Sequence, residues 1–242
     1  MSGHSKWHNI QNTKGKADAA RSKIFTKISR EIAVAVKLGG SNPSSNAKLA
    51  SLITKAKQNN IPNDNIERTI KKASGELSSV NYETCTYEGY GIGGSAVIVE
   101  CLTDNKNRTA GDVRHAFDKF GGSLGSTGCV SYLFQRKGVI VIPRTEGLDS
   151  DELMMQALDA GAIDVEEFDD EIEVITQPNE VETVNKNLEN AGYTSVSAEA
   201  CLLPDSYVDL DEAKEATFTK MLSMLEDLDD VQEVFHNVNL SE

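Results

Sequence analysis

The spacing of apolar residues changes along this chain of 242 residues, close to residue 80. Before that point, Ile24, Ile28 and Ile32 recur about once per helical turn, whereas Ser95–Leu102 is a run rich in β-branched residues. Apolar residues that line one face of a helix recur every three or four positions, and a continuous apolar run is typical of a buried strand. The chain therefore predicts a helical first part followed by an α+β remainder.

Three helices are predicted in the first part. Gly39-Gly40 ends the first helix, and Ile61-Pro62 prevents the second from continuing. Asp64 is expected to cap the third helix, with Glu67 completing a capping box. The predicted ranges are Asp18–Leu38, Ser44–Gln58 and Asp64–Gly75.

Residues 136–203 predict a complete unit of their own. Its elements follow the order strand, helix, strand, strand, helix, strand, which is typical of a ferredoxin-like sandwich. The predicted ranges are Val139–Ile142, Ser150–Ala160, Ile163–Phe168, Ile172–Thr176, Asn179–Asn190 and Ser195–Leu203.

The segments on either side of this unit complement each other. The earlier segment predicts a hairpin, a helix and a further strand, at Thr84–Glu88, Ser95–Leu102, Lys106–Phe120 and near Gly128–Phe134. The missing helix and strand of a second sandwich are predicted in the tail, at Leu210–Leu228 and Val231–Val238. The expected fold is therefore α+β and multidomain, with an N-terminal three-helix domain followed by two ferredoxin-like α/β sandwich domains, one inserted in the other. The expected domains are residues 1–79, residues 80–135 plus 204–242, and the inserted residues 136–203.

Charge is distributed very unevenly along the chain. Residues 1–75 carry 14 Lys and Arg against four acids, a net charge of +10, whereas residues 141–242 carry four bases and 27 acids. The whole-chain net charge of −14 therefore conceals a basic module and an acidic body. Such asymmetry suggests that the module binds a polyanion that the body avoids.

Composition argues against several other classes of protein. No apolar run approaches the ~20 residues that a membrane helix needs, and the first residues lack the apolar core of a signal peptide, so a cytoplasmic location is expected. The four cysteines follow no C-x-x-C spacing and are expected to be buried thiols. His4 and His8 lie four residues apart without further ligands nearby, and neither a metal nor a cofactor is expected.

Two glycine motifs resemble those of enzymes, but each stands in the wrong structural context. Gly89-x-Gly91-x-x-Gly94 precedes a predicted strand, whereas the dinucleotide fingerprint must open a helix. Gly121-x-Ser123-x-Gly125 joins a predicted helix to a strand, which is the reverse of a nucleophile elbow. No catalytic residue is assigned, and the chain is expected not to be an enzyme.

The basic residues of the first helix gather on one side. At roughly 100° per residue, Lys23, Lys27 and Arg30 share a narrow arc opposite the apolar face. A basic face that is merely solvated would have interleaved acids, and few are present.

The types of basic residue indicate how the module binds. Lys outnumbers Arg by 11 to 3 in residues 1–75, which favours contacts with phosphates over base reading. Trp7 can stack on a base or pack against the bundle. The candidate nucleic-acid-binding residues are Lys6, Trp7, His8, Lys14, Lys16, Arg21, Lys23, Lys27, Arg30, Lys37, Lys55, Arg68, Lys71 and Lys72.

Short motifs along the whole chain resemble those of the YebC family. They begin near Met1 and end at Val234-Phe235-His236-Asn237-Val238. The others are Gly3-His4-Ser5-Lys6-Trp7, Lys23-Ile24-Phe25-Thr26-Lys27, Ile61-Pro62-x-Asp64-Asn65-Ile66-Glu67-Arg68, Tyr87-Glu88-Gly89-Tyr90-Gly91, Thr103-Asp104-Asn105-x-Asn107-Arg108-Thr109 and Phe117-x-Lys119-x-Gly121-Gly122-x-Leu124-Gly125.

The resemblance implies a helical N-terminal domain, two α/β domains with one inserted in the other, and a role in gene expression. Members of the family are commonly described as probable DNA-binding transcriptional regulators, and their mitochondrial relatives are translational activators. Two hypotheses stay open: a transcriptional regulator that binds DNA, and a translation factor that binds ribosomal RNA, each through the N-terminal domain. The acidic body is expected to be a solvated surface or to meet a ribosome or a basic protein. The chain is expected to be a monomer without a membrane partner.

Overall fold

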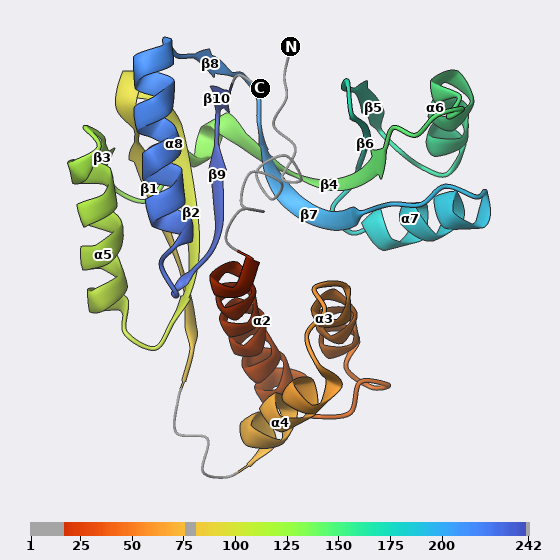
Figure 1. The fold of residues 1–242 in the computed structure, drawn as a ribbon, viewed down its shortest axis with the longest axis horizontal. Coiled ribbons are helices and arrows are strands. Elements are labelled where there is room, and N and C mark those ends of the chain that lie inside the picture. The colour runs from red at the N-terminus through yellow and green to blue at the C-terminus, as the bar shows by residue number, and fades with distance from the viewer. Residues whose placement is uncertain (1–16, 76–80, 241–242) are drawn as a thin grey trace. The chain divides into compact units, whose positions relative to one another are not determined.

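The structure is a computed structural model of the chain, and it describes residues 17–75 and 81–240 (Figure 1). The described residues divide into two compact units. The first unit comprises residues 17–75, 81–129 and 213–234, and the second comprises residues 130–212 and 235–240. The finer division into residues 1–79, 80–135 plus 204–242, and 136–203 stays a prediction.

Three helices form the N-terminal part of the first unit: α2 (Ala17–Gly39), α3 (Ala47–Gln58) and α4 (Asn63–Ser74). Their shared core includes Ile28, Ile32, Leu49, Leu52 and Ile66, which are at most 3% exposed. This confirms the predicted helices and the apolar face of the first one.

Two details at the helix starts differ from expectation. Helix α3 begins at Ala47 because Asn46 caps it: the side chain accepts a hydrogen bond from Leu49 N and donates one to Ala35 O. The capping box at Asp64 was wrong, because Pro62 occupies the cap position of α4 and no side chain caps the helix. The ring of Pro62 fixes its φ near the helical value and lets the helix start one residue earlier, which places Asp64 in the first turn.

A four-stranded sheet forms the rest of the first unit. Its order is β3-β1-β2-β9, so that the hairpin strands β1 and β2 are central. Gly93 and Gly94 in the hairpin connection have φ of 73° and 79°, a left-handed conformation that favours glycine. The bounds are β1 (Glu83–Tyr90), β2 (Ala96–Thr103), β3 (Ser123–Leu124) and β9 (Val231–His236).

Helices α5 (Lys106–Lys119) and α8 (Glu212–Glu226) pack on one face of this sheet (Figure 1). A Cβ on Gly89 would lie 2.7 Å from the ring of Phe117 on α5, and one on Gly91 would lie 3.2 Å from that of Phe218 on α8. Residues two apart on an extended chain share a face, so both helices cover the same side.

The strand expected near Gly128–Phe134 was wrong. Residues 125–130 form a loop, followed by a 3-10 turn at Ser131–Leu133, and the next strand starts only at Phe134. A side chain, and not strand pairing, holds this loop in place. Gly128 N donates a hydrogen bond to Glu88 Oε1 at 2.8 Å, and the φ of Gly128 is +88°.

The second unit contains an antiparallel sheet with the order β5-β6-β4-β7. Helices α6 and α7 pack on one face, around a core that includes Ile140, Leu153, Ile172 and Leu188. This strand order confirms the ferredoxin-like arrangement predicted for residues 136–203. The bounds are β4 (Phe134–Pro143), α6 (Ser150–Asp159), β5 (Asp164–Glu167), β6 (Glu171–Thr176), α7 (Val181–Asn190) and β7 (Ser197–Pro204). The short strands β8 (Val208–Asp209) and β10 (Val238–Asn239), also in the second unit, pair in parallel with each other.

Three smaller expectations concern thiols, membranes and metals. All four cysteines are reduced; Cys101 and Cys201 are buried, as predicted, whereas Cys85 and Cys129 are half-buried. Among the helices of the described ranges, none is long and apolar enough to cross a membrane. Within residues 17–75 and 81–240, no three His, Cys, Asp or Glu side chains are grouped so that they could hold a metal ion.

Candidate nucleic-acid interface

The described residues include only part of the predicted binding set. Lys6, Trp7, His8, Lys14 and Lys16 lie outside the described residues, as does the side chain of Arg21. The remaining candidates divide between helix α2 and the pair α3 and α4, and the two groups have very different surroundings.

The basic face of α2 meets carboxylates that lie 200 residues away in the sequence. These acids belong to residues 226–233, which end helix α8 and begin strand β9 and are called the acidic turn below. Lys23 Nζ donates a hydrogen bond to Asp227 Oδ1 at 2.5 Å, and both side chains are largely exposed. The first cation of the predicted face is therefore already paired within the chain.

Arg30 makes the most extensive contact with the acidic turn. Its Nη1 donates to Asp230 Oδ1 at 2.5 Å, to Asp229 O at 2.5 Å and to Leu102 O at 3.3 Å. The guanidinium also lies 5.6 Å from the ring centroid of Tyr82, within range of a cation–π interaction. The side chains of Arg30 and Asp230 are only 14% and 7% exposed, so this pair is part of the packed structure of the first unit.

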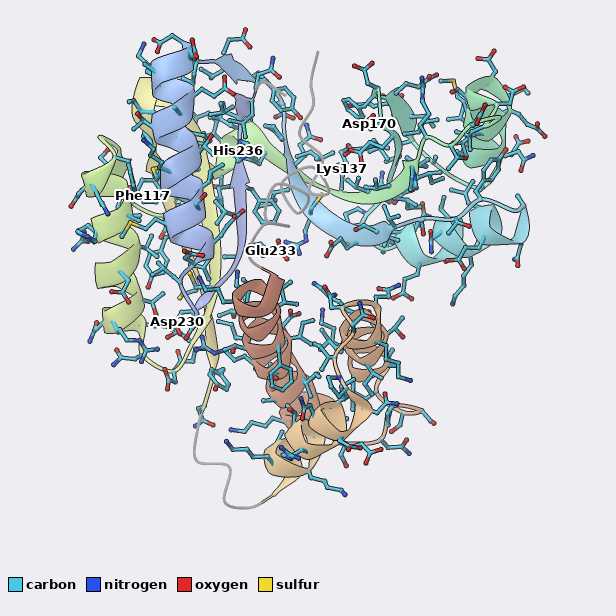
Figure 2. The ribbon with its side chains drawn as sticks, viewed as in Figure 1. Phe117, Lys137, Asp170, Asp230, Glu233 and His236 are labelled. Atoms are coloured by element: carbon cyan, nitrogen blue, oxygen red, sulfur yellow. The ribbon has the colours of Figure 1, made fainter. Side chains whose placement is uncertain are left out.

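Asp230 lies just before β9 (Figure 2). Its carboxylate accepts hydrogen bonds from several segments. Arg108 Nη2 lies 2.8 Å from Asp230 Oδ2, and the Thr103 and Thr109 hydroxyls lie 3.2 and 2.8 Å from the same oxygen. Burial raises the pKa of this carboxyl, but hydrogen bonds from Arg108, Thr109 and Arg30 outweigh that effect, so the pKa lies below its ordinary value. The motif around Arg108 thus has a structural role in the sheet and its partners.

Lys27 lies between these two pairs along the helix. Burial lowers the pKa of its ammonium, and the nearby carboxylates of Glu233 and Glu226 only partly oppose this effect. Burial likewise raises the pKa of Glu226, with Lys27 opposing it. Lys27 is therefore a partly desolvated cation within an acidic neighbourhood.

The last two candidates with inward contacts lie at helix ends. Lys37 Nζ donates to Asn81 Oδ1 at 2.9 Å, although its side chain is exposed. Lys55 on α3 is half-buried. Neither offers an unobstructed cation to a ligand in this arrangement.

The other candidates lie on an exposed surface. Arg68, Lys71 and Lys72 are exposed on α4, and their spacing of three and four residues places them on one side of the helix. Arg68 and Lys71 line an open hollow of about 360 Å³ together with Asp64 and Glu67. Lys57, near the end of α3, is exposed as well. We call Lys57, Arg68, Lys71 and Lys72 the exposed basic set.

Sequence reasoning missed one member of this set and all the acids that cover α2. Lys57 was counted in the basic excess of the module but was not chosen as a binding residue. Its place in the last turn of α3 could have identified it as a candidate. The acidic run Glu226-Asp227-Leu228-Asp229-Asp230 is visible in the sequence, but its partners are not.

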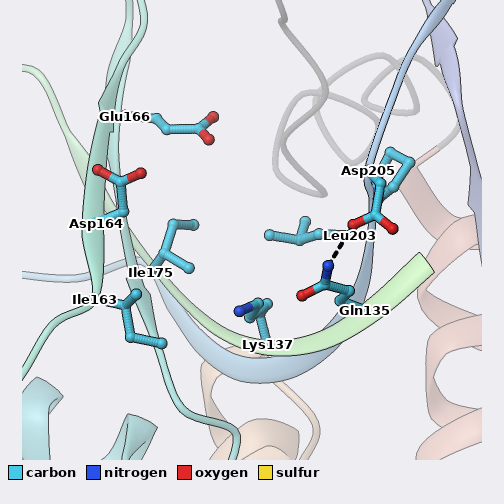
Figure 3. A pocket seen from close by; sticks show the side chains of 9 residues that line it. Gln135, Lys137, Ile163, Asp164, Glu166, Ile175, Leu203 and Asp205 are labelled. Carbon is cyan, nitrogen blue, oxygen red and sulfur yellow. Dashed lines mark hydrogen bonds between the residues drawn. The ribbon is translucent and has the colours of Figure 1, made fainter. Parts of the chain in front are cut away.

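The second unit has an acidic hollow of its own (Figure 3). The cavity measures about 190 Å³, below the ~300–1,000 Å³ of typical small-molecule sites. Asp164, Glu166 and Asp205 line it with one base, Lys137, and Gln135 Nε2 donates to Asp205 Oδ1 at 2.6 Å. These charges repel a polyanion and leave the helices as the candidate interface.

Two family models match successive parts of the chain. Residues 5–76 match the family model of the TACO1/YebC protein N-terminal domain, and residues 82–238 match that of the TACO1/YebC second and third domain. The chain is 60% identical over 242 residues to a "Probable transcriptional regulatory protein" of Clostridium botulinum (strain Okra / Type B1), covering 100% of this chain and 98% of the relative. It is 58% identical over 239 residues to a protein of the same description from Agathobacter rectalis, covering 98% and 99%. The crystal structure of a conserved hypothetical protein from Aquifex aeolicus is similar, with a TM-score of 0.83 and 46% identity over 94% of this chain and 93% of that one. By its matches to both family models over nearly its whole length, the chain belongs to the TACO1/YebC family.

Proposed function

We propose that this protein is a regulator of gene expression that binds nucleic acid through its N-terminal helices. The observation that carries the proposal is the exposed basic set on α3 and α4, which belongs to a module of strong positive charge. The description of its relatives as probable transcriptional regulatory proteins supports the same class of function.

The chemistry of this set favours the phosphate backbone over the bases. Three of its four members are lysines, which act as flexible point charges, and only Arg68 has a guanidinium that can pair with a guanine edge. Phosphate contacts hold a protein on nucleic acid without specifying sequence, and they make affinity fall steeply with salt. We therefore expect binding that varies strongly with salt and weakly with sequence.

The test compares two triple variants with the same change in charge. Arg68→Ala, Lys71→Ala and Lys72→Ala are combined in one protein, and Lys186→Ala, Lys214→Ala and Lys220→Ala, which are exposed residues outside the N-terminal helices, are combined in the control. Fluorescence anisotropy with a labelled 20-base-pair DNA duplex and a labelled 20-nucleotide RNA hairpin gives the affinity at several salt concentrations.

Loss of the α4 cations is expected to weaken binding and to lower the slope of log affinity against log salt by about 0.9 for each duplex phosphate contact removed. The control variant should keep the wild-type slope. Equal behaviour of the two variants would refute the assignment to α4, and binding to neither probe would refute the function itself. A clear preference for the RNA hairpin would favour the alternative of a ribosome-associated translation factor.

A further inference from the structure

The contacts between α2 and the acidic turn have the chemistry of a protein–phosphate interface. In each ion pair a Lys or Arg donor meets a carboxylate oxygen: Lys23 with Asp227, and Arg30 with Asp230, both at 2.5 Å. Carboxylate and phosphate oxygens are alternative acceptors for the same cationic donors. The acidic turn therefore occupies the positions that a nucleic-acid backbone would take on this helix.

The strength of these contacts is graded along α2. The Lys23–Asp227 pair has side chains that are 38% and 69% exposed, and exposed pairs of this kind contribute only about 0.2–1 kcal/mol. Arg30 and Asp230 at the other end are buried and are held by further hydrogen bonds to Asp229 O and from Arg108. The contact can thus open at Lys23 while Arg30 keeps the helix attached.

Lys27, between the two pairs, would gain a hydrogen-bond acceptor from an exchange of partner. Its ammonium forms no hydrogen bond with any residue that the structure describes, although Glu226 and Glu233 lie near enough to affect it. A half-buried ammonium without a hydrogen-bond partner loses hydration without full compensation. A phosphate oxygen reaching this position would supply the missing acceptor.

We propose that the acidic turn is an autoinhibitory contact, which competes with nucleic acid for Lys23 and Lys27 and is displaced when the backbone extends from the exposed basic set onto α2. This inference rests on the proposed function, since it assumes that the N-terminal helices bind nucleic acid. It assigns the acidic residues 226–233 a regulatory role: they limit affinity until nucleic acid displaces them from α2.

The first test removes the competing charges without touching Asp230. Asp227→Asn and Glu233→Gln are combined in the full chain, and the control combines Asp112→Asn and Asp118→Asn, two exposed acids of α5 in the same unit with the same change in charge. Anisotropy with the DNA duplex and the RNA hairpin should show affinity about twofold to fivefold tighter for the first variant than for its control. Equal affinities for the two variants would overturn the inference.

The second test follows the contact itself in the wild-type protein. A water-soluble carbodiimide is expected to join Lys23 Nζ to Asp227 as an amide, because the two groups lie 2.5 Å apart, and the cross-linked peptide can be quantified by mass spectrometry. Asp227→Asn should abolish this product. Saturating DNA duplex or RNA hairpin should lower the yield severalfold. An undiminished yield under saturating probe would overturn the inference while leaving the proposed function intact. If neither the duplex nor the hairpin binds at all, the inference and the proposed function are both refuted.

Discussion

Asp230 pairs with two arginines, Arg30 and Arg108, and its neutralisation should be costly. Asp230→Asn keeps the shape of the side chain but removes the negative charge that Arg30 and Arg108 face. Breaking a buried ion pair from one side costs about 3–5 kcal/mol. Because Arg108 is 46% exposed and water can partly replace its partner, we expect a value at or just below the lower end of that range, about 2–3 kcal/mol.

Urea unfolding followed by circular dichroism measures this loss. With a slope of about 1–3 kcal/mol per molar urea, the midpoint of the first unit's transition should fall by roughly 1–2 M at pH 7. The pKa of Asp230 is lowered in the folded state, so its contribution is present above the unfolded pKa of about 3.9 and disappears as pH falls through the folded pKa. The difference between wild type and variant should therefore be constant from pH 7 to about pH 5 and shrink below about pH 4.

Asp227→Asn is the matched control, since it removes the same charge from the same turn. Its side chain is 69% exposed and, among residues 17–75 and 81–240, forms an ion pair only with Lys23, so the expected loss is at most about 1 kcal/mol. If both variants lose the same stability at pH 7, the assignment of Asp230 as the buried centre of this network is wrong.

Two further predictions concern the second unit, with a control in the first. Burial beside Glu171 and Glu166 raises the pKa of Glu173 to about 8, so the wild type should lose stability as pH rises from about 4.5 through 8. Glu173→Gln should remove that loss, giving an equal Tm at about pH 4 and a higher Tm at pH 9, by roughly 4–8 °C per kcal/mol recovered for a unit of this size; a Tm difference independent of pH would contradict this. A Cβ at Gly138 would lie 2.1 Å from Thr176 Oγ1 and 3.0 Å from Gln177 O, so Gly138→Ala should cost about 1–3 kcal/mol in urea unfolding. Gly111→Ala, which meets nothing within 4 Å on the exposed side of α5, should instead gain about 0.5–1 kcal/mol, and a neutral Gly138→Ala would disprove the steric argument.

Most of the fold follows from patterns that are local in the sequence. Helices α2 to α4 and the order of elements in residues 136–203 were predicted because apolar spacing and turn residues act over a few positions. The errors at Asp64 and at Gly128–Phe134 arose where a neighbouring group competed: Pro62 took the cap position, and Glu88 held the loop. Such competition depends on residues that the local pattern does not include.

For the candidate site, too, some features follow from local sequence patterns and others depend on the tertiary structure. The sequence by itself determined that the N-terminal module is basic, that it is helical, and that Arg68, Lys71 and Lys72 belong to its third helix. Only the tertiary structure decided that Lys23 and Arg30 meet Asp227 and Asp230, because an ion pair over 200 residues forms only when the sheet places β9 and the end of α8 beside α2. Charge and periodicity determine what a side chain can bind, whereas long-range packing determines which partner within the chain it contacts.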